Sequence, residues 1–138
     1  MEAISNIGRL DKVSIMNNGF EIKWLSDPEE KDYPAAESYL SLIYDSQYAE
    51  GIVAKLRKQA IKKFKAKDIF RASGLSLLGV SNFHVEKDRK KIQDGKHISP
   101  ILLVRDQKNS KVVIADGYHR MCAVYSFDED ELIPCKIV

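Results

Sequence analysis

The most constraining feature of this sequence is an apolar run that stops abruptly at an acid and a glycine. Val112–Ala115 is apolar throughout, and Asp116 and Gly117 follow it directly. The residues from there to Phe127 are apolar around much of a helical repeat, which is typical of a buried helix. The pattern predicts a strand over Lys111–Asp116 that bends at Gly117 into a helix, since glycine tolerates the backbone angles of a sharp turn.

Further strands are expected on both sides of this bend. Pro100–Arg105 is predicted to be a buried strand, 106–110 a turn, and 132–138 a final strand. In that final strand Pro134 favours an edge position or a strand start, because proline cannot donate to a ladder. Strand, strand, helix, strand indicates an α+β fold, with a small mixed sheet packed against helices.

The upstream residues predict a hairpin and several helices. The hairpin has Val13–Met16 and Phe20–Leu25 as its arms, around the turn signal Asn17-Asn18-Gly19. Asp32 and Pro34 mark a helix start. The apolar stripes of two helices then follow, at Ala36, Leu40, Ile43 and Tyr44 and at Ala49, Ile52, Val53 and Leu56.

A short strand and two helices complete the expected order. The strand is expected at Ile61–Phe64, one helix at Ala66–Ala72 before Gly74, and a polar helix at Val85–Gln93 before Gly95. We expect residues 1–59 to be an N-terminal extension of hairpin and two helices, packed on a core domain of residues 60–138.

Composition places the chain among ordinary globular proteins. It has 138 residues, 44% apolar and 30% charged, which suits one domain. The apolar runs are too short to cross a membrane, and Met1-Glu2-Ala3 does not resemble a signal peptide, so a cytoplasmic location is expected. Cys122 and Cys135 are too few for a disulfide framework, and both are expected to serve packing.

Charge is spread unevenly although the net charge is only +2. Segment 55–71 holds eight basic residues against Asp68, and segment 87–96 holds a second basic group. These segments could face the phosphates of a nucleic acid or an acidic protein partner. The competing interpretation is a solvated helix face.

The strongest candidate site is the bend itself, at Asp116–Arg120. A helix start directs free backbone N–H groups and partial positive charge at one spot, which suits an anion. Arg120 in the first turn is unfavourable beside that charge unless an anion binds, and its guanidinium can hold a phosphate with two parallel bonds. Gly117, Tyr118, His119 and Arg120 are the predicted phosphate-binding residues. Asp116 is the candidate metal ligand or general base, assisted by His119.

A purely structural interpretation of the same residues also exists. In that interpretation Asp116 caps the helix, a common role for aspartate. Arg120 then pairs with Asp116 or with the acidic segment 128–131. Contact between Arg120 and an acid would favour this interpretation over anion binding.

The site also carries a family resemblance. Gly117, Arg120 and Ala123 reproduce the G-x-x-R-x-x-A signature of the ParB/sulfiredoxin superfamily, and Asp116–Arg120 resembles the D-G-x-H-R form of its free-standing, nucleotide-dependent serine kinases. Gly95–Val104 is similar to the superfamily's stretch in which a helix is followed by a glycine, four further residues, Pro-Ile and an apolar strand. The similarity covers about residues 60–138, and the whole chain resembles small bacterial proteins that end in an A-D-G-Y-H-R segment.

The resemblance implies a nucleotide whose phosphates bind at Gly117–Arg120, together with Mg²⁺. The kinase branch needs a further upstream acid, for which Asp68, Glu86 and Asp88 are the candidates. Sulfiredoxins carry a reactive cysteine where this chain has Tyr118, so sulfinic-acid reduction is not expected. No DNA-reading helix-turn-helix follows the domain in this sequence, so DNA loading of the partition-protein type is not expected either.

Two functions follow as hypotheses. The first is a nucleotide-binding enzyme, either a Mg²⁺-dependent phosphotransferase or a nucleotide hydrolase, with Asp116 and His119 as its catalytic residues. The alternative is a non-catalytic module of the same fold that binds nucleic acid or protein.

Overall fold

The computed structural model describes residues 21–138. The helices, in chain order, are α1 (Asp32–Leu40), α2 (Ser46–Arg57), α3 (Ala66–Ser73), α4 (Phe83–Gln93), the short 3₁₀ turn η1 (Gln107–Asn109) and α5 (Tyr118–Phe127). The strands are β1 (Lys23–Trp24), β2 (Lys62–Lys65), β3 (His97–Ile98), β4 (Ile101–Asp106), β5 (Lys111–Asp116) and β6 (Leu132–Ile137). The predicted α+β class is confirmed.

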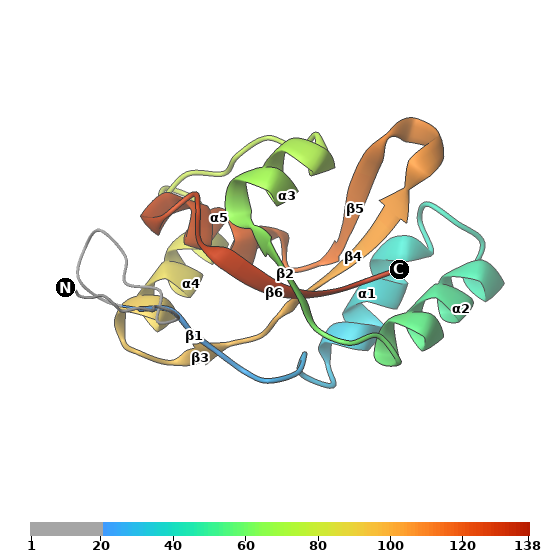
Figure 1. Cartoon of the computed structure of the whole chain (residues 1–138), viewed down its shortest axis with the longest axis horizontal. Coiled ribbons are helices and arrows are strands. Elements are labelled where there is room, and N and C mark those ends of the chain that lie inside the picture. Colours follow the sequence, from blue (N-terminus) through green and yellow to red (C-terminus); the bar gives the residue numbers. More distant parts are fainter. Residues whose placement is uncertain (1–20) are drawn as a thin grey trace.

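A mixed sheet of four strands, in the order β2-β6-β4-β5, forms the centre of the molecule (Figure 1). Strand β6 runs parallel to β4 and antiparallel to β2, and β4 and β5 form an antiparallel hairpin. The two-residue strands β1 and β3 pair separately, in parallel. The hairpin predicted for Val13–Met16 and Phe20–Leu25 lies mostly outside the described residues, and Lys23–Trp24 of its second arm pairs with His97–Ile98.

The sheet is apolar on both faces because its side chains alternate between two cores. Leu103, Val112 and Ile114 point into a core shared with α3, α4 and α5. Leu102, Val104, Val113 and Ala115 point into a second core shared with α1 and α2. Side chains between Tyr33 and Leu56 therefore pack directly on this face of the sheet.

The position of Pro134 corrects an expectation. We predicted an edge strand or a strand start, whereas β6 lies between β2 and β4, and Pro134 pairs with Lys63 in its interior. The ladder from β6 to β4 begins only at Cys135, which pairs with Ile101. The proline thus precedes the parallel ladder, although it does not start the strand.

Smaller differences concern the first helix. The predicted apolar stripe extended to Tyr44, but α1 ends at Leu40, and Ile43 lies half exposed in the following turn. The other expected helices are present, with α3 closed by Gly74 at a φ of 67°.

In the part of the chain that the structure describes, no helix has the length and apolar character needed to span a bilayer.

Candidate functional site

The bend between β5 and α5 is present as predicted. Strand β5 ends at Asp116, α5 begins at Tyr118, and Gly117 between them has a φ of 112°. A Cβ on Gly117 would lie 2.3 Å from Cγ2 of Ile101. Glycine is therefore required here by close packing on β4 as well as by the backbone angle.

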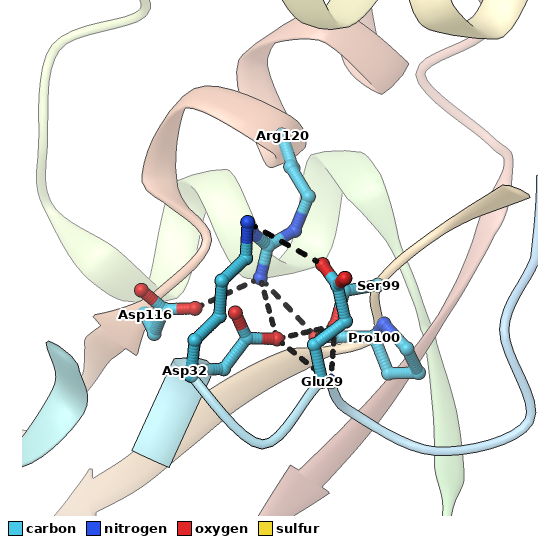
Figure 2. Close-up of polar contacts among 7 residues, drawn as sticks. Glu29, Asp32, Ser99, Pro100, Asp116 and Arg120 are labelled. Atoms are coloured by element: carbon cyan, nitrogen blue, oxygen red, sulfur yellow. Dashed lines mark hydrogen bonds and ion pairs between the residues drawn. The ribbon is translucent and has the colours of Figure 1, made fainter. Parts of the chain in front are cut away.

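The guanidinium of Arg120 is held by three oxygen atoms (Figure 2). Its Nη2 donates to Oδ2 of Asp116 at 3.0 Å and to the carbonyl oxygen of Pro100 at 3.2 Å. Oδ2 of Asp32 lies 3.8 Å from the same nitrogen. The side chain of Arg120 is only 18% exposed, so these contacts fix the guanidinium at the base of the site.

Asp32 is a site residue that sequence reasoning missed. Its side chain is 5% exposed, and its Oδ2 accepts hydrogen bonds from Oγ of Ser99 and from the backbone N–H of Glu29. Figure 2 shows these residues converging from α1 and from the segment before β4. The sequence around Asp32 predicts a helix start, and nothing in it indicates a contact with α5.

The structural interpretation of the bend is partly confirmed. Asp116 does not cap α5, since the cap position belongs to Gly117 and no side-chain cap bond is present there. Arg120 does pair with Asp116, four residues before it. In the acidic segment, Asp130 instead pairs with Lys67 at 2.7 Å and with Lys65 at 3.8 Å.

A polar pocket of about 170 Å³ opens in front of this bend. All five residues of Asp116–Arg120 line it, so the structure brings every predicted site residue together. Helix α4 supplies the opposite wall through His84, Lys87, Asp88 and Lys91. The pocket therefore lies between the start of α5 and one face of α4.

The sequence signals that the pocket residues of α4 share one helix face, but not that this face lines a pocket. These four residues recur at the i, i+3, i+4, i+7 spacing of one helix face. In the sequence Lys87 belongs to the basic segment 87–96, and His84 is not among the predicted site residues. Of the three candidate upstream acids, Asp88 lines the pocket, whereas Asp68 lines a separate groove and Glu86 lies 3.4 Å from Arg89.

The surroundings in the site shift the pKa values of two aspartates and one histidine. Burial raises the pKa of Asp88, although the neighbouring cations Arg120 and Lys91 oppose the shift. Burial also raises the pKa of Asp116, against the effect of Arg120 and with the help of the nearby Asp32 carboxylate. We treat Asp116 as ionised near neutral pH because Nη2 of the guanidinium lies 3.0 Å from it.

His119 is biased toward its neutral form. Burial lowers its pKa, and the adjacent His84, whose ring centroid is 4.8 Å away, lowers it further. A neutral imidazole at pH 7 can accept a proton, which is the property that the predicted catalytic role requires.

The carboxylates do not form a ready-made metal cage. Within residues 21–138, no group of three or more His, Cys, Asp or Glu side chains is arranged to hold a metal ion. Asp116, the predicted metal ligand, is bound to Arg120. Asp88 is the pocket carboxylate for which no ion pair with another described residue is present.

The two cysteines are buried, as expected for packing residues. Burial raises the pKa of Cys122 and raises that of Cys135 to about 12, so neither supplies a thiolate at neutral pH.

The basic segment 55–71 is spread over three elements, the end of α2, β2 and α3. Arg57 is paired with Glu30 at 2.6 Å, and Lys67 is paired with Asp130. Lys62 and Lys63 are exposed, and neither has an ion pair with another described residue.

No protein-family model, no curated protein and no solved structure matches this chain. The resemblance of residues 60–138 to the ParB/sulfiredoxin superfamily therefore stays a prediction. The function has to be inferred from the chemistry of the pocket itself.

Proposed function

We propose that the protein binds a nucleotide through its phosphates in the pocket between α4 and α5. The observation that supports this most directly is the pair of lysines on the pocket wall, Lys87 and Lys91, which face the same space as Arg120. Asp116 neutralises part of the charge of Arg120, so the two lysines supply most of the positive charge that a phosphate would meet. The uncapped start of α5 adds free N–H groups and positive partial charge at the same place. A compact polyanion is the ligand that such a wall favours.

A neighbouring groove supports a nucleotide rather than inorganic phosphate alone. This groove measures about 400 Å³ and shares Asp116–His119 with the phosphate pocket. Tyr39, Leu75 and Ile114 give it a largely apolar lining. A molecule with a phosphate at one end and an apolar ring at the other would fill both spaces.

The same geometry supports phosphoryl transfer or nucleotide hydrolysis as the reaction. Such chemistry depends mainly on positioning and on neutralisation of phosphate charge, to which Mg²⁺ contributes when bound. Asp88 would contact the ion, because Asp116 is occupied by Arg120. Arg120 and the lysines of α4 would orient the phosphates, and neutral His119 would accept the proton of the attacking group.

A thermal-shift panel tests the binding step. Nucleoside mono-, di- and triphosphates are added with and without Mg²⁺ to the wild-type chain and to Lys87→Gln/Lys91→Gln. We expect stabilisation of the wild type and its loss in the double variant. Lys90→Gln removes a charge from an exposed position on the same helix, outside the pocket, and should leave the shift intact.

Arg120→Ala should also abolish the nucleotide-induced shift, but it breaks the ion pair with Asp116 as well. The lysine variants therefore give the cleaner comparison. An unchanged nucleotide shift in Lys87→Gln/Lys91→Gln would exclude the pocket as the phosphate site.

Exposed lysines support a second proposal, in which the protein is a nucleic-acid-binding module. Lys55, Lys58, Lys62 and Lys63 are exposed, and none forms an ion pair with another described residue. Binding through them would release counterions, so a gel shift with single-stranded or duplex DNA should weaken steeply with salt. Absence of any shift at low salt would remove this alternative.

A further inference from the structure

The groove that adjoins the phosphate pocket crosses the open edge of the central sheet. Strand β5 is the last strand of that sheet, and both α1 and α3 contact it (Figure 1). Ile114 belongs to the core shared with α3, whereas Ala115 belongs to the core shared with α1, and both residues line the groove. The groove therefore runs over the edge of β5 from one face of the sheet to the other.

The two walls of this groove carry exposed apolar side chains of different shape. On α1, Tyr39 is 43% exposed, and Ala35 lies one helical turn before it. On the other wall Leu75, which directly follows the cap residue Gly74 of α3, is 39% exposed. An aromatic ring on one wall and an aliphatic side chain on the other suit a flat ring that inserts between them.

Polarity in the groove is concentrated at the end that it shares with the phosphate pocket. The shared residues are Asp116–His119. The other described lining residues are Ala35, Tyr39, Leu75, Ile114 and Ala115. Among these five side chains the hydroxyl of Tyr39 is the one polar group. A nucleotide has the same order of polarity, from charged phosphates through the ribose to a flat base, so the lining matches a nucleotide whose phosphates lie in the adjoining pocket.

We propose that Tyr39 is the residue that recognises the base of the nucleotide, and that the site prefers purines to pyrimidines. This inference rests on the proposed function, because the groove receives a base only when phosphates occupy the adjoining pocket. The base stacks on the ring of Tyr39 and packs against Leu75 from the other side. Because stacking on an aromatic ring grows with the apolar area in contact, a two-ring purine binds more tightly than a one-ring pyrimidine.

The assignment divides recognition between two parts of the chain. Tyr39 belongs to the N-terminal extension, whereas Lys87, Lys91 and Arg120 lie in residues 60–138. The extension contributes the base contact, and the downstream residues contribute the phosphate contacts.

Isothermal calorimetry on the full-length chain tests the assignment with ADP, GDP, CDP, UDP and inorganic pyrophosphate, each in the presence of Mg²⁺. We expect ADP and GDP to bind about two- to fivefold more tightly than CDP and UDP. Tyr39→Ala should weaken ADP binding about fivefold or more, as expected for loss of base stacking. Pyrophosphate affinity should stay unchanged in this variant, because pyrophosphate has no base.

Three further variants separate stacking from a structural effect. Tyr39→Phe keeps the ring and should keep both the affinity for ADP and the purine preference, which should fall toward one in Tyr39→Ala. Leu75→Ala on the other wall should weaken ADP binding about two- to fivefold. Tyr48→Ala removes a tyrosine that is 58% exposed on α2, outside both cavities, and should bind all five ligands as the wild type does.

The outcomes distinguish failure of the base site from failure of the nucleotide site. Equal ADP affinity of Tyr39→Ala and the wild type would overturn the role of Tyr39, as would tighter binding of CDP and UDP than of ADP and GDP. In either case the phosphate pocket stands if Lys87→Gln/Lys91→Gln still loses pyrophosphate binding. Absence of binding by pyrophosphate and by all four diphosphates would remove the nucleotide site and the role of Tyr39 together.

Discussion

Gly117 is the residue on which the geometry of the candidate site depends most directly. Its φ of 112° and its approach to Ile101 both exclude a side chain. The sequence indicated the first constraint, because a glycine between an apolar strand and a helix marks a sharp bend. It could not indicate the second, because the packing of β4 under the bend is a tertiary contact.

Replacement of Gly117 by alanine should destabilise the fold severely. The added Cβ would meet Ile101 at 2.3 Å in a backbone conformation that alanine rarely adopts, and we expect a loss of about 2–4 kcal/mol. Urea unfolding followed by circular dichroism measures the change. Gly51→Ala is the control, since Gly51 lies in α2 with nothing within 4 Å of its Cβ position, and it should stabilise by about 0.5–1 kcal/mol. Equal unfolding midpoints for Gly117→Ala and the wild type would contradict the packing argument.

Asp88 should make stability depend on pH in a defined direction. Burial raises its pKa in the folded chain above the unfolded value of about 3.9. The folded state therefore binds the extra proton, and the resulting stability is present below the unfolded pKa and is lost as the pH rises through the folded one.

Asp88→Asn removes this dependence because asparagine does not titrate. In the absence of Mg²⁺, we expect the variant to be more stable than the wild type at pH 7 and the difference to vanish at about pH 3.5. Urea midpoints at both pH values provide the measurement. A variant that is less stable than the wild type at pH 7 would mean that the charge contacts with Arg120 and Lys91 outweigh burial.

At the scale of elements, the sequence predicted the downstream half well. The bounds of β5 were predicted to the residue, and α5 begins one residue after the predicted opening at Gly117, because an apolar run, a glycine and a helical stripe give clear signals. The interior position of Pro134 was not predictable in the same way, since strand order and register follow from tertiary pairing. The sequence shows that the pocket residues of α4 share one helix face. That face indicates a pocket wall only once α4 is known to pack beside α5.

The start of α4 should influence both stability and ligand binding. Oδ1 of Asn82 accepts hydrogen bonds from the N–H groups of His84 at 3.0 Å and Val85 at 3.1 Å, so Asn82→Ala should cost about 1 kcal/mol. Because His84 lines the pocket, we also expect a smaller nucleotide-induced thermal shift.

Asp45→Ala provides the matched comparison for this cap. Asp45 caps α2 through the N–H of Tyr48 at 2.9 Å, remote from the pocket lining. It should lower stability by a similar amount and leave the nucleotide shift unchanged. If both variants reduced the shift equally, the effect of Asn82 would reflect global stability alone.

The whole molecule is organised around a sheet with a core on each face. The sequence patterns predicted an N-terminal extension packed on a core domain. They did not reveal that this extension is needed to cover one apolar face of the sheet. Without α1 and α2, four apolar sheet side chains would be exposed to water, namely Leu102, Val104, Val113 and Ala115.

Residues 60–138 should therefore fail to fold alone. We expect this fragment to show no cooperative thermal transition, because an exposed apolar face of that kind favours aggregation or collapse. Residues 21–138 serve as the comparison and should unfold in a single transition, monitored by circular dichroism. A cooperative melt of the 60–138 fragment would show that the extension is a separate unit.

The contact between Asp32 and Arg120 has a consequence for the molecule as a whole. It connects α1, which packs with α2 on one face of the sheet, to α5 on the other face, at the edge of the pocket. A ligand that draws the guanidinium toward its own oxygens would loosen this junction, which makes occupancy and the attachment of α1 thermodynamically linked. Linkage is reciprocal, so a partner that bound α1 more firmly or displaced it would alter the affinity of the pocket for its ligand by the same factor.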